Sequence, residues 1–266
     1  MPYDFEGKGL NPADEIVSER QYNKKVFFVG FNQKKYLCHV GHIHYKKNDG
    51  SMDDIDPCLA FDDVTRVHKH GKASYECEIP EYADETIKYK NKFEGAKIVV
   101  KYKSEASHVL GVYHEDPNLG FYVEYPDAFG EGFTLRIYSH WRTIKKQIIL
   151  ASQPILTQAK DFNFQIVLTS PTDEIRVGNK PMVFDNDTIW DKETDLVFRG
   201  DKRIKILNLD GDQVIIDPAI IRDSGQYQDT LKMKLVKTVD GNLKIKQIID
   251  HDTPWADLTY PVFIES

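Results

Sequence analysis

The chain has 266 residues with a hydrophobic share of 41% and an aromatic share of 12%, which suffices for one large or two ordinary domains and excludes a disordered polymer. A net charge of −7 opposes affinity for phosphate backbones, and no stretch approaches the roughly 18 apolar residues of a membrane span, so neither nucleic acid nor membrane is an expected partner. The three cysteines form no close-set pair, which indicates reduced thiols rather than a disulfide framework.

Residues 1–20 are predicted to form an extended arm, because they are polar and contain Gly7, Gly9 and Pro12 without a sustained apolar period. Three apolar side chains, Tyr3, Phe5 and Leu10, lack an evident local partner. They either cover the edge of the domain or dock on a neighbouring subunit.

From residue 25 onward, short runs rich in Val, Ile, Phe, Tyr and Thr alternate with turn residues, which is the period-two pattern of β-strands. Strands are predicted at 25–29, 34–40, 43–46, 73–79, 87–90, 97–102, 109–113 and 120–125. The second half adds 134–139, 143–150, 163–169, 195–199, 203–207, 213–216, 230–238 and 242–249.

Asp-Gly pairs mark the hairpins that join these strands. Lysines alternate with apolar residues over 231–237 and again over 243–246, and Asp240-Gly241 lies between the two runs, where glycine supplies the positive φ of a tight turn. Asp210-Gly211 and, more weakly, Asp49-Gly50 carry the same signal.

No segment sustains the apolar spacing of a helix over three turns. The prediction is therefore an all-β protein with little or no helix, built as an antiparallel β-sandwich or barrel. We expect two packed β domains, at 21–152 and 153–266, with the boundary near Pro154.

Two pairs of histidines are candidate metal ligands. If His42 and His44 lie on a strand, their side chains point to the same face and could bind one metal ion together. Lysines rather than carboxylates follow them, so sheet-surface or turn histidines are the favoured interpretation. His68 and His70, beside Gly71, are predicted to lie in a solvated turn.

Asp53, Asp54 and Asp56 form an acidic stretch that lacks the ligand spacing of an EF-hand. A solvated loop is predicted there, with calcium binding as the alternative.

An aromatic and acidic segment surrounds Pro126. It contains Tyr122, Tyr125 and Phe129 together with Glu124, Asp127 and Glu131. These residues could stack and cleave sugars, form a subunit interface, or serve as structural aromatics.

The chain has no Gly-x-Ser-x-Gly elbow, no Gly-rich loop before a helix and no Cys-x-x-Cys pair. The sequence thus offers no recognisable catalytic motif, and we expect a protein without enzymatic activity or cofactor. A metal-dependent β-barrel enzyme built on His42 and His44 stays a third alternative.

Two segments near the ends of the chain carry a family resemblance. The stretch His-Tyr-Lys-Lys-Asn-Asp-Gly-Ser-Met-Asp-Asp-Ile-Asp at 44–56 and the Tyr-Pro-Val at 260–262 resemble β-rich modules of bacteriophage structural proteins, which also occur in large bacterial surface and Rhs-type proteins. Such modules often carry tryptophan between the glycine and the Asp-Ile-Asp, where this chain has Met52 and Asp53.

The resemblance implies a structural protein of a phage particle, either a head auxiliary or cement protein or a neck or tail component. Its expected partners are other virion proteins or copies of itself, and its expected location is the virion, after synthesis in the host cytoplasm without a signal peptide. The alternative is a carbohydrate-binding or carbohydrate-active sandwich that uses Tyr122 and Tyr125, with a host-surface glycan as ligand.

Overall fold

The chain folds entirely as β-structure. The computed structural model describes residues 10–21, 23–30, 33–38, 44–47, 49–72, 75–91, 99–116, 120–139, 144–156, 158–167, 174–177, 180–181, 197–198, 203–207, 213–237, 242–250 and 253–265. In these ranges the helical segments are 3-10 turns of three residues, η2 (Pro12–Asp14), η3 (Val17–Glu19) and η5 (Trp255–Asp257). No helix in these ranges is long and apolar enough to cross a membrane.

Two large antiparallel sheets form the body. The seven-stranded sheet has the order β10 (Val112–Asp116), β11 (Gly120–Tyr125), β12 (Phe133–Ser139), β13 (Ile144–Leu150), β24 (Val262–Glu265), β20 (Ile220–Arg222) and β21 (Gln228–Thr230). The nine-stranded sheet has the order β17 (Val197–Phe198), β22 (Lys232–Lys237), β23 (Leu243–Ile249), β14 (Lys160–Val167), β9 (Val99–Ser104), β8 (Thr86–Asn91), β7 (Tyr75–Pro80), β6 (Val67–Lys72) and β5 (Asp56–Asp62).

Three smaller sheets complete the fold. A four-stranded sheet has the order β16 (Lys180–Pro181), β15 (Glu174–Val177), β18 (Ile204–Leu207) and β19 (Gln213–Ile216). Near the N-terminus, β1 (Lys24–Gly30) pairs with β2 (Gln33–Cys38), and β3 (His44–Lys46) pairs with β4 (Met52–Asp54).

The inner faces of the two large sheets pack on each other as a sandwich. Strand β14 shows why: Phe162, Phe164 and Ile166 are fully buried while the residues between them are partly exposed, as expected for a strand with one face in a core. The ring of Phe162 meets that of Phe133 from the other sheet at a centroid distance of 5.6 Å. The all-β sandwich is therefore confirmed, and the sheets do not close into a barrel.

Both large sheets draw strands from both halves of the chain. The expected boundary near Pro154 falls between β13 and β14, yet β13 pairs with β24 and β14 pairs with β9. A division at that point would cut across both sheets. The residues before and after Pro154 therefore belong to one packed sandwich.

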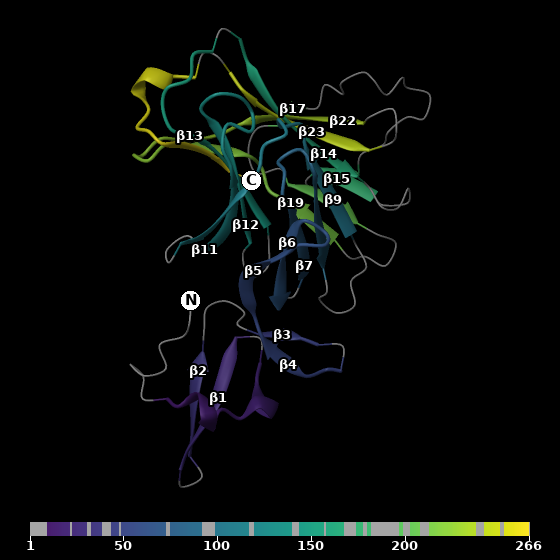
Figure 1. Ribbon diagram of the computed structural model, residues 1–266, viewed down its shortest axis with the longest axis vertical. Helices are drawn as coiled ribbons and strands as arrows, with labels where there is room; N and C mark the ends of the chain where they lie inside the picture. Colours follow the sequence, from purple (N-terminus) through teal and green to yellow (C-terminus); the bar gives the residue numbers. More distant parts are fainter. Residues whose placement is uncertain are drawn as a thin grey trace.

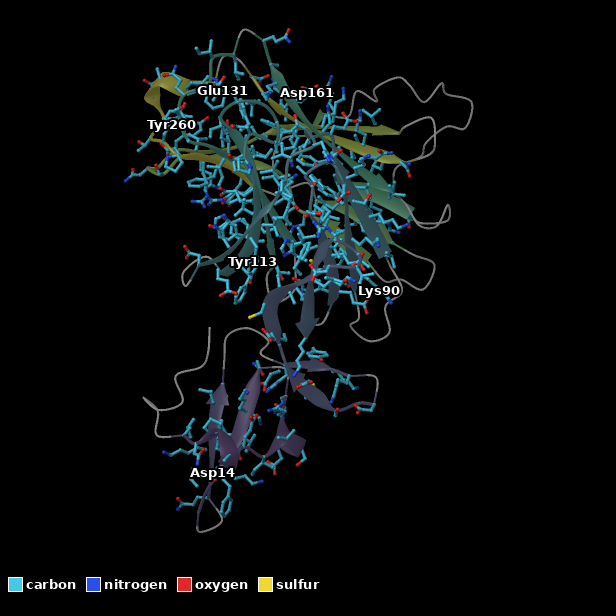
Figure 2. All side chains as sticks on the ribbon, in the orientation of Figure 1. Asp14, Lys90, Tyr113, Glu131, Asp161 and Tyr260 are labelled. Atoms are coloured by element: carbon cyan, nitrogen blue, oxygen red, sulfur yellow. The ribbon has the colours of Figure 1, made fainter. Side chains whose placement is uncertain are left out.

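A small lobe precedes the sandwich. Strands β1 to β4 with η2 and η3 lie apart from the two large sheets, and β5 lies where the lobe meets the body (Figure 1). Asp14 marks the lobe, and Tyr113 marks the end of the sandwich that faces it (Figure 2).

Each of the sixteen predicted strands overlaps an observed strand. The Asp49-Gly50 hairpin is confirmed, since Gly50 has a φ of 85° and Lys46 pairs with Met52 across the turn. The other two Asp-Gly turns lie outside the described residues, but the strands that flank them pair as antiparallel neighbours. No predicted strand of its own corresponds to β4, β5, β6, β15, β16, β20, β21 or β24.

Candidate functional site

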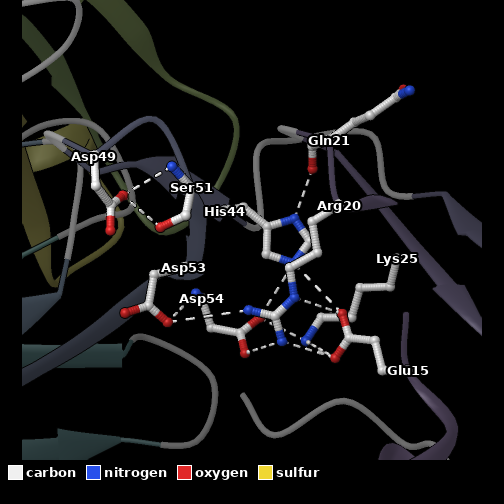
Figure 3. Close-up of polar contacts among 9 residues, drawn as sticks. All are labelled: Glu15, Arg20, Gln21, Lys25, His44, Asp49, Ser51, Asp53 and Asp54. Carbon is white, nitrogen blue, oxygen red and sulfur yellow. Dashed lines mark hydrogen bonds and ion pairs between the residues drawn. The ribbon is translucent and has the colours of Figure 1, made fainter. Parts of the chain in front are cut away.

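Five ionisable side chains meet inside the N-terminal lobe (Figure 3). Glu15 lies between the two 3-10 turns, Arg20 follows η3, Lys25 comes from β1, His44 from β3 and Asp54 from β4. Segments that are not adjacent in the chain are thereby joined through their charges.

Glu15 and Asp54 share the cations Arg20 and Lys25. The Glu15 carboxylate accepts two hydrogen bonds from the Arg20 guanidinium, at 2.7 and 2.8 Å. The Lys25 ammonium lies 2.5 Å from Asp54 Oδ1 and 3.6 Å from Glu15 Oε2. Arg20 also donates to Asp54 over 3.2 Å, so each carboxylate contacts both cations.

His44 completes the cluster and is fully buried. Its Nδ1 lies 2.6 Å from the carbonyl oxygen of Gln21, which can only accept, so Nδ1 carries a proton. Its Nε2 lies 3.3 Å from Asp54 Oδ1 and 3.9 Å from Glu15 Oε1. The imidazole thus lies between the Gln21 backbone and the two carboxylates.

Cations and carboxylates alternate in the cluster. Arg20 and Lys25 face the two central carboxylates, and Arg20 also lies 4.0 Å from the carboxylate of Asp53. Burial opposes ionisation of Asp54, but its contacts with His44 and Lys25 outweigh burial and hold the pKa of the carboxyl well below its ordinary value.

This arrangement is chemically suited to holding the lobe together rather than to binding a metal. The side chains of Arg20 and Lys25 already contact the carboxylate oxygens that a metal ion would need as ligands. Within the described ranges, no group of three or more His, Cys, Asp and Glu side chains is placed to hold a metal ion. His42 lies outside those ranges.

The acidic stretch was expected to be a solvated loop, and that prediction was wrong. Asp54 and Asp53 lie in strand β4 and Asp56 begins β5. The cations of a different part of the chain, Arg20 and Lys25, draw Asp54 into the cluster. Those partners are 29 or more positions away in the sequence, so the stretch alone could not reveal them.

The outer surface of the lobe is apolar and basic. Cross-strand pairing places Lys24, Phe28 and Tyr36 on one face of the β1–β2 hairpin. Phe28 is 47% exposed and Tyr36 58% exposed, and the Lys24 ammonium lies 5.0 Å from the centre of the Tyr36 ring. Val17 and Val29 add exposed apolar surface nearby in the lobe. We call the surface formed by Lys24, Phe28 and Tyr36 the hairpin face.

A charge signal in the sequence accompanies this surface. Residues 21–48 contain six lysines and no aspartate or glutamate, in a chain whose net charge is −7. Lys34 is paired with Glu19 at 2.5 Å and Lys25 is buried in the cluster. Strand β2 also has one edge with no neighbouring strand among the described residues.

The aromatic residues predicted to form an interface are mostly inside the body. Tyr125 is 1% exposed, and its hydroxyl donates to the carbonyl oxygen of Pro80 over 2.6 Å in the core. Phe129 packs edge-on against the rings of Phe162 and Phe164. These positions correct the expectation of an accessible interface there, because the aromatic rings fill the space between the sheets.

Tyr122 lies on the outer face of the seven-stranded sheet but is covered. The Arg136 guanidinium lies 5.0 Å from its ring centre, and His114 stacks on it at 4.9 Å. Glu124 is engaged by Arg136 in an ion pair. Neither Tyr122 nor Tyr125 therefore presents a free ring for stacking on a sugar.

The remaining predicted site residues lie in the lobe, in a turn of the body, or outside the described residues. Leu10 is buried, which favours the alternative that it covers its own domain. Tyr3 and Phe5 lie outside the described residues. Asp127 and Glu131 lie in the turns that lead from β11 to β12, where the Asp127 carboxylate accepts a hydrogen bond from the Gly132 amide at 2.7 Å.

The solvated turn predicted for His68 and His70 was also wrong. Both residues lie in strand β6 and both are buried. His68 stacks on Tyr113 from the opposite sheet, and burial lowers its pKa, which favours the neutral ring. Two inward-facing histidines with lysine between them follow the period of a strand, a signal that Gly71 obscured.

Comparison with known proteins adds no relative to this description. No family model, no curated protein and no solved structure matches the chain. What defines the class of protein is the fold itself, an all-β sandwich with several antiparallel sheets.

Proposed function

We propose that this chain is a non-enzymatic structural protein of a phage particle that binds other virion proteins through its N-terminal lobe. The observation that supports this most directly is the exposed hairpin face of Lys24, Phe28 and Tyr36. Large aromatic side chains that stay exposed on a firmly held element are typical anchors of protein interfaces.

The distribution of exposed apolar side chains favours the lobe over the body. Single exposed apolar residues are common on any soluble protein. Here four of the ten large exposed hydrophobic side chains of the described residues fall between Val17 and Tyr36. The other six are spread over the much longer body, so the lobe is the more concentrated surface.

The charge cluster supplies the rigidity that an anchor needs. It ties Glu15, Lys25, His44 and Asp54 together behind the hairpin, and a surface held in one conformation loses less entropy when a partner binds. The lysines of 21–48 favour an acidic partner surface. The resemblance at 44–56 and 260–262 adds the virion as the setting.

The test is co-sedimentation of the purified chain with capsid and tail preparations of phage particles from its own source. The double variant Phe28→Ser, Tyr36→Ser should lose association by at least tenfold, because removing an aromatic anchor typically costs about 2 kcal/mol or more.

A matched control exchanges exposed apolar side chains of the body. Val64 and Ile155 are 92% and 96% exposed, and the variant Val64→Ser, Ile155→Ser should bind as the unmodified chain does. Equal losses in both variants, or failure of the unmodified chain to bind any preparation, would contradict the proposal.

A further inference from the structure

Eight lysines lie on the outer face of the nine-stranded sheet. Successive side chains of a strand point to opposite faces, and the residues between these lysines, such as Met233 and Ile245, pack in or against the core. The lysines form four copies of the pattern Lys-x-Lys: Lys88 and Lys90 in β8, Lys101 and Lys103 in β9, Lys232 and Lys234 in β22, and Lys244 and Lys246 in β23. We call the surface formed by these eight lysines the lysine face.

The strand order brings the four copies together. The neighbours in this part of the sheet are β22, β23, β14, β9 and β8, so only β14 separates the two pairs of lysine-bearing strands (Figure 1). Strand β14 adds Asn163 and Gln165 to the same face, and the register places Gln165 between Lys244 and Lys103. Two distant parts of the chain thereby form one basic surface.

The register also puts like charges directly opposite each other. Lys234 pairs with Lys246 across β22 and β23, and Lys88 pairs with Lys101 across β8 and β9. Like charges in such positions destabilise a sheet, and breaks in a local rule concentrate at functional sites. An anion bound across these pairs would relieve the repulsion.

The lysine face keeps an excess of positive charge after its ion pairs are counted. Five of the eight lysines contact a carboxylate, in the ion pairs Lys88–Glu78, Lys90–Glu76, Lys232–Asp250, Lys244–Glu105 and Lys246–Asp161. Lys101 and Lys103 form no ion pair with any residue that the structure describes, and Lys103 is exposed. Eight ammonium groups therefore face five carboxylates, in a chain whose net charge is −7.

This net charge does not oppose an anionic partner at the lysine face. Five strands at about 4.8 Å between neighbours are about 19 Å wide, whereas charges are screened over about 8 Å at physiological ionic strength. Carboxylates beyond that distance contribute little to the potential at the face. The expectation that nucleic acid is not a partner used the net charge alone, so it does not extend to this surface.

The composition of the face favours a nucleic acid over a protein. Protein interfaces are enriched in aromatic residues and depleted of lysine, and none of the large exposed hydrophobic side chains of the described residues lies in these five strands. Lysine, asparagine and glutamine side chains are common contacts of phosphate oxygens. The described outward-facing residues of the five strands include no aromatic ring on which an unpaired base could stack, which favours a duplex.

We propose that the lysine face binds a nucleic-acid duplex through its phosphate backbone, without reading the base sequence. Lysines on both sides of β14 neutralise the phosphates, and the side-chain amides of Asn163 and Gln165 donate hydrogen bonds to phosphate oxygens between them. Because such contacts release counterions, the affinity falls steeply with salt. This site is separate from the hairpin face, which is proposed to bind protein.

The test is fluorescence anisotropy with two labelled DNA duplexes of unrelated sequence, titrated with the full chain. Both should bind equally well, with a dissociation constant of about 10⁻⁶ to 10⁻⁴ M. The double variant Lys101→Gln, Lys103→Gln should weaken the binding of both at least about tenfold at about 50 mM salt. It should also make the plot of log K against log salt shallower by about 2, since each phosphate contact contributes about 0.9 to the slope.

The matched control is Lys34→Gln, Lys35→Gln, which removes the same charge from β2 in the lobe and should bind both duplexes as the unmodified chain does. Equal weakening in the two variants, a clear preference for one duplex, or no anisotropy change at about 10⁻⁴ M chain would each overturn the proposal.

Two further measurements separate this proposal from a protein-binding role. Poly-glutamate should compete much less well than unlabelled duplex, because the duplex carries one charge per about 1.7 Å of its axis. Equal competition would overturn the proposal and indicate an acidic protein partner. The variant Phe28→Ser, Tyr36→Ser should bind the duplexes normally, so that the hairpin face and the lysine face can fail independently.

Discussion

The body and the N-terminal lobe are held together by different interactions. The body has a continuous core of aliphatic and aromatic side chains from both large sheets, among them Phe162, Phe164 and Ile148. In the described part of the lobe, only Leu10, Val26 and Phe27 are buried apolar residues. A unit this small buries too little apolar surface to rely on it alone.

In the lobe, contacts between charged and polar side chains take the place of an apolar core. The buried residues there include Lys25 and His44, which contact carboxylates rather than apolar neighbours. Apolar burial tolerates small rearrangements, whereas a buried charge cluster depends on every partner. We therefore expect a substitution in the apolar core to lower the stability of the whole body, and a substitution in the charge cluster to lower the stability of the lobe alone.

The largest effect is expected in the body, from Phe162→Ala. Phe162 is fully buried and contacts Phe129 and Phe133, so its removal leaves a cavity that should cost about 3–5 kcal/mol of unfolding free energy. Chemical denaturation monitored by circular dichroism would measure it. Ile155→Ala, at a 96% exposed position, should change the value by less than about 0.5 kcal/mol. A similar cost for both variants would disprove a single shared core.

The next effect is expected in the lobe, from Glu15→Ala. This change removes one of the two carboxylates that Arg20 and Lys25 share, and taking one partner out of a buried charge cluster should cost about 3 kcal/mol of local stability. Hydrogen exchange should speed up in β1 and β3 while β12 and β13 stay protected.

Glu19→Ala is the matched control for Glu15→Ala. Glu19 pairs with Lys34 at the surface, where both side chains are about 40% exposed, and such pairs contribute less than about 1 kcal/mol. If exchange in the body accelerated together with the lobe in Glu15→Ala, the two regions would form one cooperative unit.

The same contrast explains what could be predicted from the sequence. Strands such as 120–125 and 213–216 were placed to the residue, because alternation of apolar and polar side chains is a local signal. The hairpin at Asp49-Gly50 was equally local. The pairing of β24 between β13 and β20 was not predictable, because the residues of a strand do not indicate which distant strands it pairs with.

The candidate site depended on distant contacts as well. Glu15, Lys25 and Asp54 come together only after folding, and an acidic stretch by itself is typical of a solvated loop. Tyr122 and Tyr125 were expected at an interface because aromatic residues favour both interfaces and cores. The Lys-x-Lys pattern of the lysine face is visible in the sequence, but the strand order that brings its four copies together is not.

The smallest effect is the response to acid, which should differ between the two regions. The pKa of Asp54 is lowered in the folded lobe, so its stabilising contribution is complete above the ordinary carboxyl value of about 3.9 and is lost as the pH falls below it. Hydrogen exchange in β1 and β3, corrected for its intrinsic pH dependence, should therefore accelerate between about pH 5 and pH 2. The variant Asp54→Asn should lack this acceleration, since an amide does not titrate.

The body offers the matching measurement at Glu265. Burial opposes its ionisation, but Arg222 and Lys145 outweigh burial and lower the pKa of this carboxyl too. Glu265→Gln should therefore reduce the acid response of β13 and β24 and leave that of β1 unchanged. If Asp54→Asn altered the acid response of β13, or Glu265→Gln that of β1, the two sets of charges would be coupled through the junction at β5 rather than acting within separate regions.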